Sequence, residues 1–361
     1  MKVKAIGLDL AKNVFQVHGV DDRDRKLFNR QLKHAQVMEF FVNLPPCLVA
    51  MEACTSAHYW ARKLSALGHT VKLIAPQHVK PYVKTNKNDA ADAEAICEAA
   101  CRPKTTFVAA KSPEQQAVGA LHAIRDGAMK ARNAVSNRLR GLLAEFGVRV
   151  PKGISHVAKH VPEALEDGGN ELPTVLRMAL FDEYEQFKAL DARIAQVHKQ
   201  IDQWHRDSAA SQALEKVPGI GVLTATSLAA HAGDPDAFVN GRQVGAWLGI
   251  VPKQHSSGGK TKLLGISKHG DSRLRTLLIH GARSVLSSLK RRLAAGLDPA
   301  TLTSTERWLL EMLKRRPANV VAVALANKNA RTAWAVLKYG RPYEANHVSL
   351  SPRARAALAA G

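Results

Sequence analysis

The sequence predicts an α/β domain at the N-terminus, followed by a mostly α-helical remainder. Two observations predict this division. Short apolar runs with the alternation typical of strands occur up to residue 74, and short helical segments separate them. From residue 113 onwards, apolar residues instead recur at three- and four-residue spacing over two long stretches, which is the period of an amphipathic helix.

The N-terminal elements are expected in the order three strands, helix, strand, helix, strand, helix. The first three strands alternate well enough to pair as a meander, and the later strands alternate with helices, as they do in α/β sheets. This order predicts an RNase H-like, or RuvC-like, sheet. The strands are expected at residues 2–9, 13–20, 26–32, 47–52 and 70–74, and the helices at 34–42, 57–67 and 89–101.

Four acidic residues stand where these elements would bring them together. Asp9 and Glu52 each end an apolar strand, and Asp89 and Asp92 lie three residues apart at the start of a helix. Strand ends converge, and positions i and i+3 share one helix face. Mg²⁺ prefers such oxygen ligands, and two ions about 4 Å apart can activate the attacking oxygen and stabilise the leaving one. The four acids together predict a site for Mg²⁺, or for Mn²⁺, although Asp89 alone could simply cap its helix.

Two long helices are predicted at 113–146 and 173–206, and a connector of glycine, proline and acidic turns is predicted at 147–173. Apolar residues of the second helix recur at the spacing of a coiled-coil seam. The seam could join two copies of the chain or pack on the helix at 113–146, and the sequence favours neither. The seam residues are Phe187, Leu190, Ile194, Val197, Ile201 and Trp204.

The chain is strongly basic. It holds 52 lysines and arginines against 31 acids, which gives a net charge of +21. Residues 241–316 alone hold 15 basic and 4 acidic residues. Such a field attracts polyanions, nucleic acid first, although solubility or an anionic membrane surface would also suit a basic chain. Because the sequence has neither a membrane-length apolar run nor a signal-peptide pattern, we expect a soluble, cytoplasmic protein with no membrane partner.

One glycine motif precedes this basic region. The run Val217-Pro218-Gly219-Ile220-Gly221 lies between two helical segments and resembles the turn of a helix-hairpin-helix unit. In such a turn, Gly219 and Gly221 would let the backbone approach a phosphate beside a helix N-terminus. The alternative is a plain proline-glycine turn between core helices.

A second motif lies inside the basic region, at Ser256-Ser257-Gly258-Gly259-Lys260-Thr261-Lys262. We expect a flexible loop in which a serine can approach a phosphate while the lysines neutralise its charge. The residues alone favour a loop that grips a backbone phosphate over a loop that carries a nucleophile. A basic helix is expected from Asp271. The candidates for contacts with a nucleic-acid backbone are Lys260, Lys262, Arg273 and Arg275.

These motifs together resemble those of DEDD-type insertion-sequence transposases, the IS-one-ten group, which also includes the Piv-type DNA invertases. In the N-terminal half the resemblance is carried by residues 6–12, 51–54 and 87–93. In the C-terminal half it is carried, in the family's order, by 218–221, 247–252 and 257–260. The resemblance covers residues 3–340.

The resemblance implies a transposase that cuts and rejoins DNA strands. Its RuvC-like domain would hold Mg²⁺ on a tetrad, here Asp9, Glu52, Asp89 and Asp92. Ser257, with Ser256 as the fallback, would be the nucleophile that forms a phosphoserine link to DNA. The implied partners are donor and target DNA, a structured guide RNA (a bridge RNA) that pairs with both, and further copies of the chain in a homodimer or homotetramer. The implied location is a prokaryotic cytoplasm, on the nucleoid when the protein is active.

The predicted domains are a RuvC-like catalytic domain, a long-helix module, a basic helical transposase domain and a flexible tail. The helix at 113–146 could also belong to the catalytic domain. The main alternative function is a structure-selective, metal-dependent endonuclease of the RuvC resolvase type that uses the tetrad alone. A third reading is a catalytically inert nucleic-acid-binding protein. The domains are expected at residues 1–112, 113–208, 209–340 and 341–361.

Overall fold

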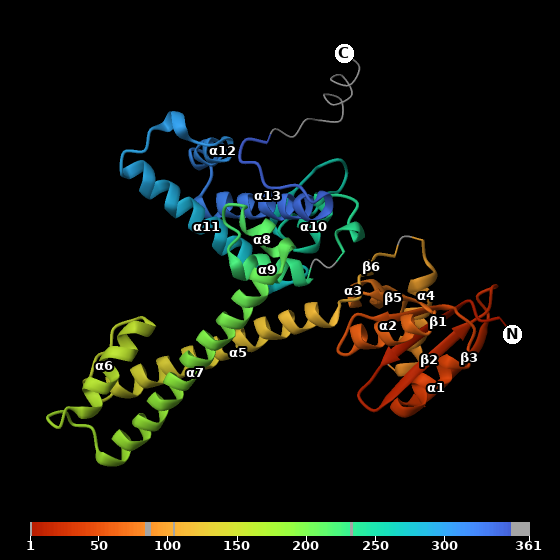
Figure 1. Cartoon of the computed structure of the whole chain (residues 1–361), viewed down its shortest axis with the longest axis horizontal. Helices are drawn as coiled ribbons and strands as arrows, with labels where there is room; N and C mark the ends of the chain where they lie inside the picture. The colour runs from red at the N-terminus through yellow and green to blue at the C-terminus, as the bar shows by residue number, and fades with distance from the viewer. Residues whose placement is uncertain (1, 84–87, 104, 232–233, 348–361) are drawn as a thin grey trace. The chain divides into compact units, whose positions relative to one another are not determined.

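The computed structural model describes residues 2–83, 88–103, 105–231 and 234–347 (Figure 1). The chain divides into two units, one of residues 1–115 with 232–239 and one of residues 116–231 with 240–361. The first unit is a mixed α/β domain and the second is mainly helical, as the sequence predicted. Most of the predicted tail lies outside the described residues. In the described parts of the chain, no helix is long and apolar enough to cross a membrane.

The N-terminal unit is built on a six-stranded sheet with the order β3-β2-β1-β4-β5-β6. The first three strands form an antiparallel meander, β4 and β5 run parallel to β1, and β6 is antiparallel to β5. The five predicted strands are confirmed, whereas β6, a two-residue edge strand, was not predicted. The strands are β1 (Ala5–Leu10), β2 (Val14–Val20), β3 (Lys26–Lys33), β4 (Leu48–Glu52), β5 (Thr70–Ile74) and β6 (Phe107–Val108).

Helices cover both faces of this sheet. The helical segments of the unit are η1 (His34–Gln36), α1 (Val37–Val42), α2 (Ala57–Ala66), α3 (Pro76–Val79), η2 (Lys80–Tyr82), α4 (Asp89–Cys101) and η3 (Pro235–Ala237). Because side chains alternate along a strand, Ile6 and Leu8 of β1 face one side, where they are fully buried in the main core with residues of α1 and α2. Gly7 and Asp9 face the other side, which α4 covers.

α4 packs directly on the backbone of β1 at Gly7. A Cβ atom at this position would lie 2.1 Å from the carbonyl oxygen of Ala93 and 2.6 Å from the backbone nitrogen of Cys97. The residues that α4 buries are small, apart from Ile96, so the helix can lie close to the strand. The hydrogen atom that serves as the side chain of Gly7 therefore sets the distance between α4 and the sheet.

Two long helices, which lie side by side, form the first part of the second unit, and the first of them starts in the last residues of the N-terminal unit. They are α5 (Pro113–Ala144) and α7 (Thr174–Asp207) (Figure 1). The segment between them, predicted to be an irregular connector, instead contains α6 (Ile154–Glu166). Val157 and Val161 lie one turn apart on α6 and are buried in the core that α5 and α7 share. The prediction was wrong because Pro162 and the flanking glycines suggested turns, while the apolar spacing of the segment is helical.

The predicted seam of α7 is buried within this one chain. Phe187, Ile194, Val197 and Ile201 are each at most 6% exposed, and Phe187 belongs to the core that includes α5. This supports packing within the chain over pairing between two chains. Arginines of α5 also reach across to α7: Arg125 bonds to His198, Arg132 to Asp191 and Arg138 to Glu183.

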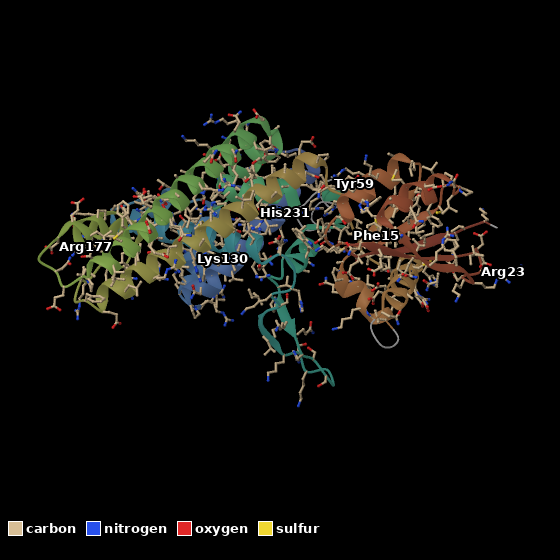
Figure 2. The ribbon with its side chains drawn as sticks, turned by 90° about the horizontal axis from the view of Figure 1, so that it is seen from below. Phe15, Arg23, Tyr59, Lys130, Arg177 and His231 are labelled. Carbon is tan, nitrogen blue, oxygen red and sulfur yellow. The ribbon has the colours of Figure 1, made fainter. Side chains whose placement is uncertain are left out.

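One arginine of α7 holds the end of α6. Arg177, labelled in Figure 2, donates from Nη1 to the carbonyl oxygens of Ala164 and Leu165, at 3.1 and 2.6 Å. These carbonyls belong to the last turn of α6, where no intrahelical donor remains for them. Its Nη2 atom donates to the Asn170 side chain at 2.6 Å. A single guanidinium thus caps α6 and fixes it to α7.

The rest of the second unit consists of packed helices and one β-hairpin. α11 and α13 lie side by side (Figure 1), and Asp271 caps α11 by accepting from the backbone nitrogens of Arg273 and Leu274. The elements are α8 (Ala209–Glu215), α9 (Val222–His231), α10 (Gly241–Trp247), β7 (Pro252–Gln254), β8 (Leu263–Ile266), α11 (Ser272–Ala294), η4 (Pro299–Thr301), α12 (Ser304–Leu313) and α13 (Ala318–Tyr339).

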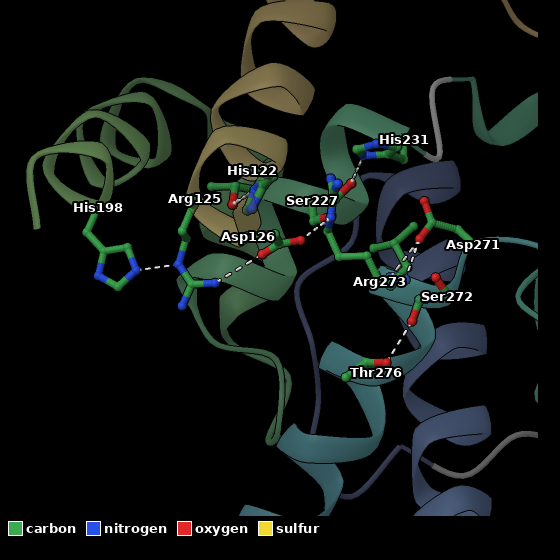
Figure 3. Close-up of polar contacts among 12 residues, drawn as sticks. His122, Arg125, Asp126, His198, Ser227, His231, Asp271, Ser272, Arg273 and Thr276 are labelled. Atoms are coloured by element: carbon green, nitrogen blue, oxygen red, sulfur yellow. Dashed lines mark hydrogen bonds and ion pairs between the residues drawn. The ribbon is translucent and has the colours of Figure 1, made fainter. Parts of the chain in front are cut away.

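A polar network joins α5, α9 and α11 (Figure 3). His122 of α5 is 1% exposed, and its Nε2 atom lies 3.0 Å from the Thr226 hydroxyl of α9. Because that hydroxyl already donates to the Val222 carbonyl, His122 is the donor. Asp126 accepts from Arg273 of α11 at 2.7 Å. Burial, followed by the nearby charge of Arg273, lowers the pKa of His122 to about 4.

We predict that Gly7→Ala destabilises the protein by about 1–3 kcal/mol, because the added methyl group would overlap the backbone of α4. Urea unfolding measures this change. The matched control is Gly127→Ala on α5, where a Cβ atom would meet nothing within 4 Å and removal of a helical glycine should stabilise by about 0.5–1 kcal/mol. Equal effects of the two changes would contradict the close approach of α4 to β1.

We also predict that His122 makes stability depend on pH between about 4 and 6.5. The unfolded chain binds a proton at His122 in this window and the folded chain does not, so its contribution is present above pH 6.5 and is lost as the pH falls. The loss amounts to on the order of 2–3 kcal/mol. Urea unfolding at pH 7 and pH 5 should show a smaller difference in His122→Gln than in the wild type. His156→Gln, at an exposed histidine, should behave as the wild type does.

Candidate functional site

The four predicted acids line one cavity of about 720 Å³ in the N-terminal unit. Leu8 pairs with Met51 across the parallel strands β1 and β4. Asp9 and Glu52 are the next residues of the two strands, so they lie at the same height along the sheet. The other two acids come from the first turn of α4. Three elements that are distant in the sequence therefore bring Asp9, Glu52, Asp89 and Asp92 to the same cavity.

The two acids of α4 do not cap that helix. The side chain of Asn88 accepts from the backbone nitrogen of Ala91 at 2.8 Å and so provides the cap. Asp89 is exposed and Asp92 is half-buried. Their carboxylates are thus left to face the cavity, and the alternative that Asp89 serves as a helix cap is excluded.

The electrostatics of Asp9 show that the four carboxylates act on one another. Burial is the largest cause that raises the pKa of Asp9, followed by the charges of Asp92, Asp89 and Glu52, and together they bring it from 3.8 to about 6. In the described parts of the chain, no three acid, histidine or cysteine side chains lie close enough together to form a finished metal site. The arrangement is a cavity with concentrated negative charge, not a closed ligand cage.

Two other polar residues line the same cavity and were not predicted from the sequence. Gln77 and Lys80 follow the end of β5 in α3 and η2. Lys80 is exposed and brings a positive charge to a cavity that is otherwise acidic. The only signal in the sequence was their place just after a strand that ends at the same sheet edge as β4.

The segment around Ser257, which was predicted to be a loop, is the connection of a β-hairpin. β7 and β8 pair antiparallel, and the nitrogen of Lys260 donates to the carbonyl of Ser257 at 3.0 Å. The two residues between them, Gly258 and Gly259, have φ values of 55° and 74°, a combination typical of a tight type I′ turn. Figure 2 shows this hairpin projecting from the other elements of its unit. The glycines therefore build a defined turn.

The hairpin distinguishes the two candidate serines. The Ser256 hydroxyl accepts a hydrogen bond from the Gln254 side chain at 2.9 Å. Ser257 is exposed at the start of the turn, and no described side chain bonds to its hydroxyl. Lys260 and Lys262 are also exposed, so the hydroxyl of Ser257 and two ammonium groups share the tip of the hairpin.

The two arginines that were predicted to contact a nucleic-acid backbone have partners inside the second unit. Arg273 forms an ion pair with Asp126. Arg275 donates to the carbonyl oxygens of Leu248 and His269 at 3.1 and 3.3 Å. These bonds hold α11 to α5 and to the end of α10. A role of Arg273 and Arg275 in nucleic-acid binding stays a prediction.

The two glycines of the proline-glycine turn have different surroundings. A Cβ atom on Gly219 would lie 3.1 Å from the Gly281 carbonyl of α11 and 3.1 Å from the Asn329 side chain of α13. Asn329 also donates to the Pro218 carbonyl at 2.8 Å. Gly221 is exposed, and a Cβ atom there would meet nothing within 4 Å. Gly219 thus packs the turn on two helices, while Gly221 has room beside the N-terminus of α9.

An acidic cavity on a mixed α/β domain, in a chain with a net charge of +21, is typical of an enzyme that acts on nucleic acid. Comparison with known proteins agrees. A transposase family model matches residues 6–147, and the model of the transposase IS116/IS110/IS902 family matches residues 211–306. The chain belongs to this IS110 family of insertion-sequence transposases, and so is an enzyme that acts on DNA.

Several relatives match along nearly the whole chain. A probable family 20 transposase of Pseudomonas aeruginosa is 52% identical, over 93% of this chain and 97% of the relative. The transposase for insertion sequence element IS1328 of Yersinia enterocolitica is 41% identical, over 94% and 98%. The transposase for insertion sequence element IS1111A of Coxiella burnetii is also 41% identical, over 94% and 91%.

We predict that Asp9→Asn stabilises the protein in the absence of divalent cations at pH 7. The folded chain holds a proton on Asp9 up to about pH 6 and the unfolded chain only up to about 3.8, so the contribution of Asp9 falls as the pH rises through this window and is unfavourable at pH 7. Removal of the charge should stabilise by about 1–2 kcal/mol, measured by urea unfolding in EDTA. The control, Asp22→Asn at an exposed acid, should change stability by less than about 0.5 kcal/mol.

Proposed function

We propose that this transposase cuts and rejoins DNA with a divalent-metal site on Asp9, Glu52, Asp89 and Asp92 and a serine nucleophile at Ser257. The observation that carries the proposal is the shared cavity. Carboxylates from β1, β4 and α4 line it together, and burial, followed by the charges of Asp92, Asp89 and Glu52, raises the pKa of Asp9 to about 6. Concentrated negative charge of this kind is costly in a fold unless a cation neutralises it.

The sheet supports an RNase H-like N-terminal domain. An antiparallel meander of three strands continues into two strands parallel to the first, in the order β3-β2-β1-β4-β5. In this topology, Asp9 lies on the central strand and Glu52 on its parallel neighbour. Asp9 and Glu52 thus lie near the carboxyl ends of two parallel strands, where ligands of α/β sheets bind.

The residues in the cavity fit Mg²⁺, with Mn²⁺ as the alternative. All four candidate ligands are carboxylates, the oxygen donors that both ions take. When bound, the metal would supply electrostatic stabilisation of charge on a phosphodiester. Asp9 must lose its proton to become a ligand, and since its pKa is about 6, it is ionised at neutral pH. Lys80, on the wall of the cavity, is placed to contact a DNA phosphate.

Ser257 is the better candidate for the nucleophile because the hydroxyl of Ser256 is held by Gln254. In the proposed step, the Ser257 oxygen attacks a backbone phosphorus atom and loses its proton to a base in the surrounding solution. An O–P bond to serine forms, the P–O bond to the leaving deoxyribose oxygen breaks, and that oxygen takes up a proton. Attack by a DNA hydroxyl then reverses the step and rejoins the strand. Lys260 and Lys262 would neutralise charge on the phosphate.

The second unit and its charge support nucleic-acid partners beyond donor and target DNA. Residues 241–316 carry 15 basic and 4 acidic residues, and only 5% of the chain is aromatic. Contacts made mainly to a phosphate backbone suit a protein that leaves sequence recognition to base pairing with a guide RNA. We include a structured guide RNA, and assembly as a homodimer or homotetramer, in the proposal.

Covalent trapping tests the serine chemistry. Purified protein with Mg²⁺, labelled donor and target DNA and its co-purified RNA should give a protein–DNA adduct on a denaturing gel. Ser257→Ala removes the attacking oxygen and should abolish the adduct, whereas the matched neighbour Ser256→Ala should retain most of it. Asp9→Ala should lose cleavage because the metal site is incomplete. Metal-dependent cleavage that is insensitive to Ser257→Ala would instead indicate a resolvase-like endonuclease that uses the acids alone.

A further inference from the structure

We propose that Asn29 is a positioning residue for the acidic cavity, and that it holds the first turn of α4 at the distance from β1 that metal binding requires. This inference rests on the proposed metal site. Asn29 lies on β3, two strands away from Asp9, and has no acidic group of its own. Its role follows from a chain of hydrogen bonds that runs from the meander to α4.

The chain begins directly opposite Asp9. Gln16 of β2 is the cross-strand partner of Asp9 in the antiparallel register, so both side chains lie on the face of the sheet that α4 covers. Gln16 is only 6% exposed. A buried amide needs hydrogen-bond partners, and the Nε2 atom of Gln16 finds one in the side-chain oxygen of Asn29.

Asn29 in turn forms a hydrogen bond to helix α4. Its Nδ2 atom donates to the backbone carbonyl of Ala90 at 3.3 Å. Ala90 lies between Asp89 and Asp92, in the turn that carries both carboxylates. The structure thus ties the strand pair that carries Asp9 to the helix turn that carries the other two acids, through two amide side chains and no ionisable group.

The chemistry of the amide explains why asparagine suits this position. The bond from Gln16 needs an acceptor on residue 29, and the bond to Ala90 needs a donor, and a single amide group supplies both. An aspartate would lose the donor and would add a fifth negative charge to the surroundings of the cavity. A leucine of similar size would keep the packing and lose both bonds.

The hydrogen bonds of Asn29 are needed because the acids of the cavity repel one another. Gly7 fixes the middle of α4 against β1, but the repulsion acts at the first turn of the helix, which carries Asp89 and Asp92. Asn29 restrains this turn. Partners that orient metal ligands from outside the ligand shell typically contribute about 10–100-fold to metal affinity or activity, and we expect Asn29 to act in this range.

The test measures Mn²⁺ binding to the full chain, with free Mn²⁺ followed by its EPR signal. Asn29→Leu should weaken binding about 10-fold while circular dichroism shows an unchanged fold. Gln31→Leu is the matched control, because Gln31 lies on the same strand and the same sheet face, is exposed, and makes no bond to α4 in the described structure. Its Mn²⁺ affinity should equal that of the wild type. Asn29→Ser repeats the test with a smaller side chain if the leucine variant does not fold.

Activity supplies a second readout that a purely structural role would not move. In Asn29→Leu, the Mn²⁺ concentration for half-maximal DNA cleavage should rise about 10-fold, while kcat at saturating Mn²⁺ is retained. If Asn29→Leu and Asn29→Ser bind Mn²⁺ as the wild type does while Asp92→Asn does not bind it, the positioning role is wrong and the metal site stands. If Asp92→Asn also binds Mn²⁺ normally, the proposed metal site is wrong and this inference falls with it.

Discussion

The contact between α4 and β1 at Gly7 is the constraint on which the acidic cavity depends. Because residue 7 has no side chain, the helix lies on the backbone of the strand, and its first turn reaches the level of Asp9, two residues further along. Asn88 caps the helix and so leaves Asp89 and Asp92 facing the cavity. A larger residue at position 7 would separate two carboxylates from the other two without changing any of the four.

The positive charge of the chain has a structural use. Three arginines of α5 bond to α7, and Arg177 caps α6. Arg273 pairs with Asp126. Guanidinium groups suit such positions because they donate several hydrogen bonds in a fixed plane. The exposed lysines at the tip of the hairpin are therefore a better guide to a nucleic-acid contact than the count of basic residues in the surrounding sequence.

Local patterns in the sequence predicted five of the six strands of the N-terminal sheet and most helices, and they placed the four acids near element ends. These predictions succeeded because alternation and helical spacing are patterns of residues that are close together in the sequence. The hairpin at 252–266 was missed because its strands are short and exposed and carry no alternating pattern. Asn29 and Lys80 were missed for another reason. Their positions near the cavity depend on how distant segments fold and pack. Nothing in the residues around Asn29 indicates its position, and Lys80 is indicated only by its place shortly after β5.

The four carboxylates of the cavity come from three different elements of the domain, and their mutual repulsion explains this distribution. Four carboxylates on a single element would repel one another in the unfolded chain as much as in the folded one. On β1, β4 and α4 they meet only after the sheet and the helix have packed. Burial, and after it the repulsion between the acids, raises the pKa of Asp9, and this repulsion acts against a framework that already exists. That framework needs rigid ties near the acids, and uncharged groups serve best because they add nothing to the repulsion. The glycine at position 7, the cap at Asn88 and the amide pair of Gln16 and Asn29 all meet this requirement.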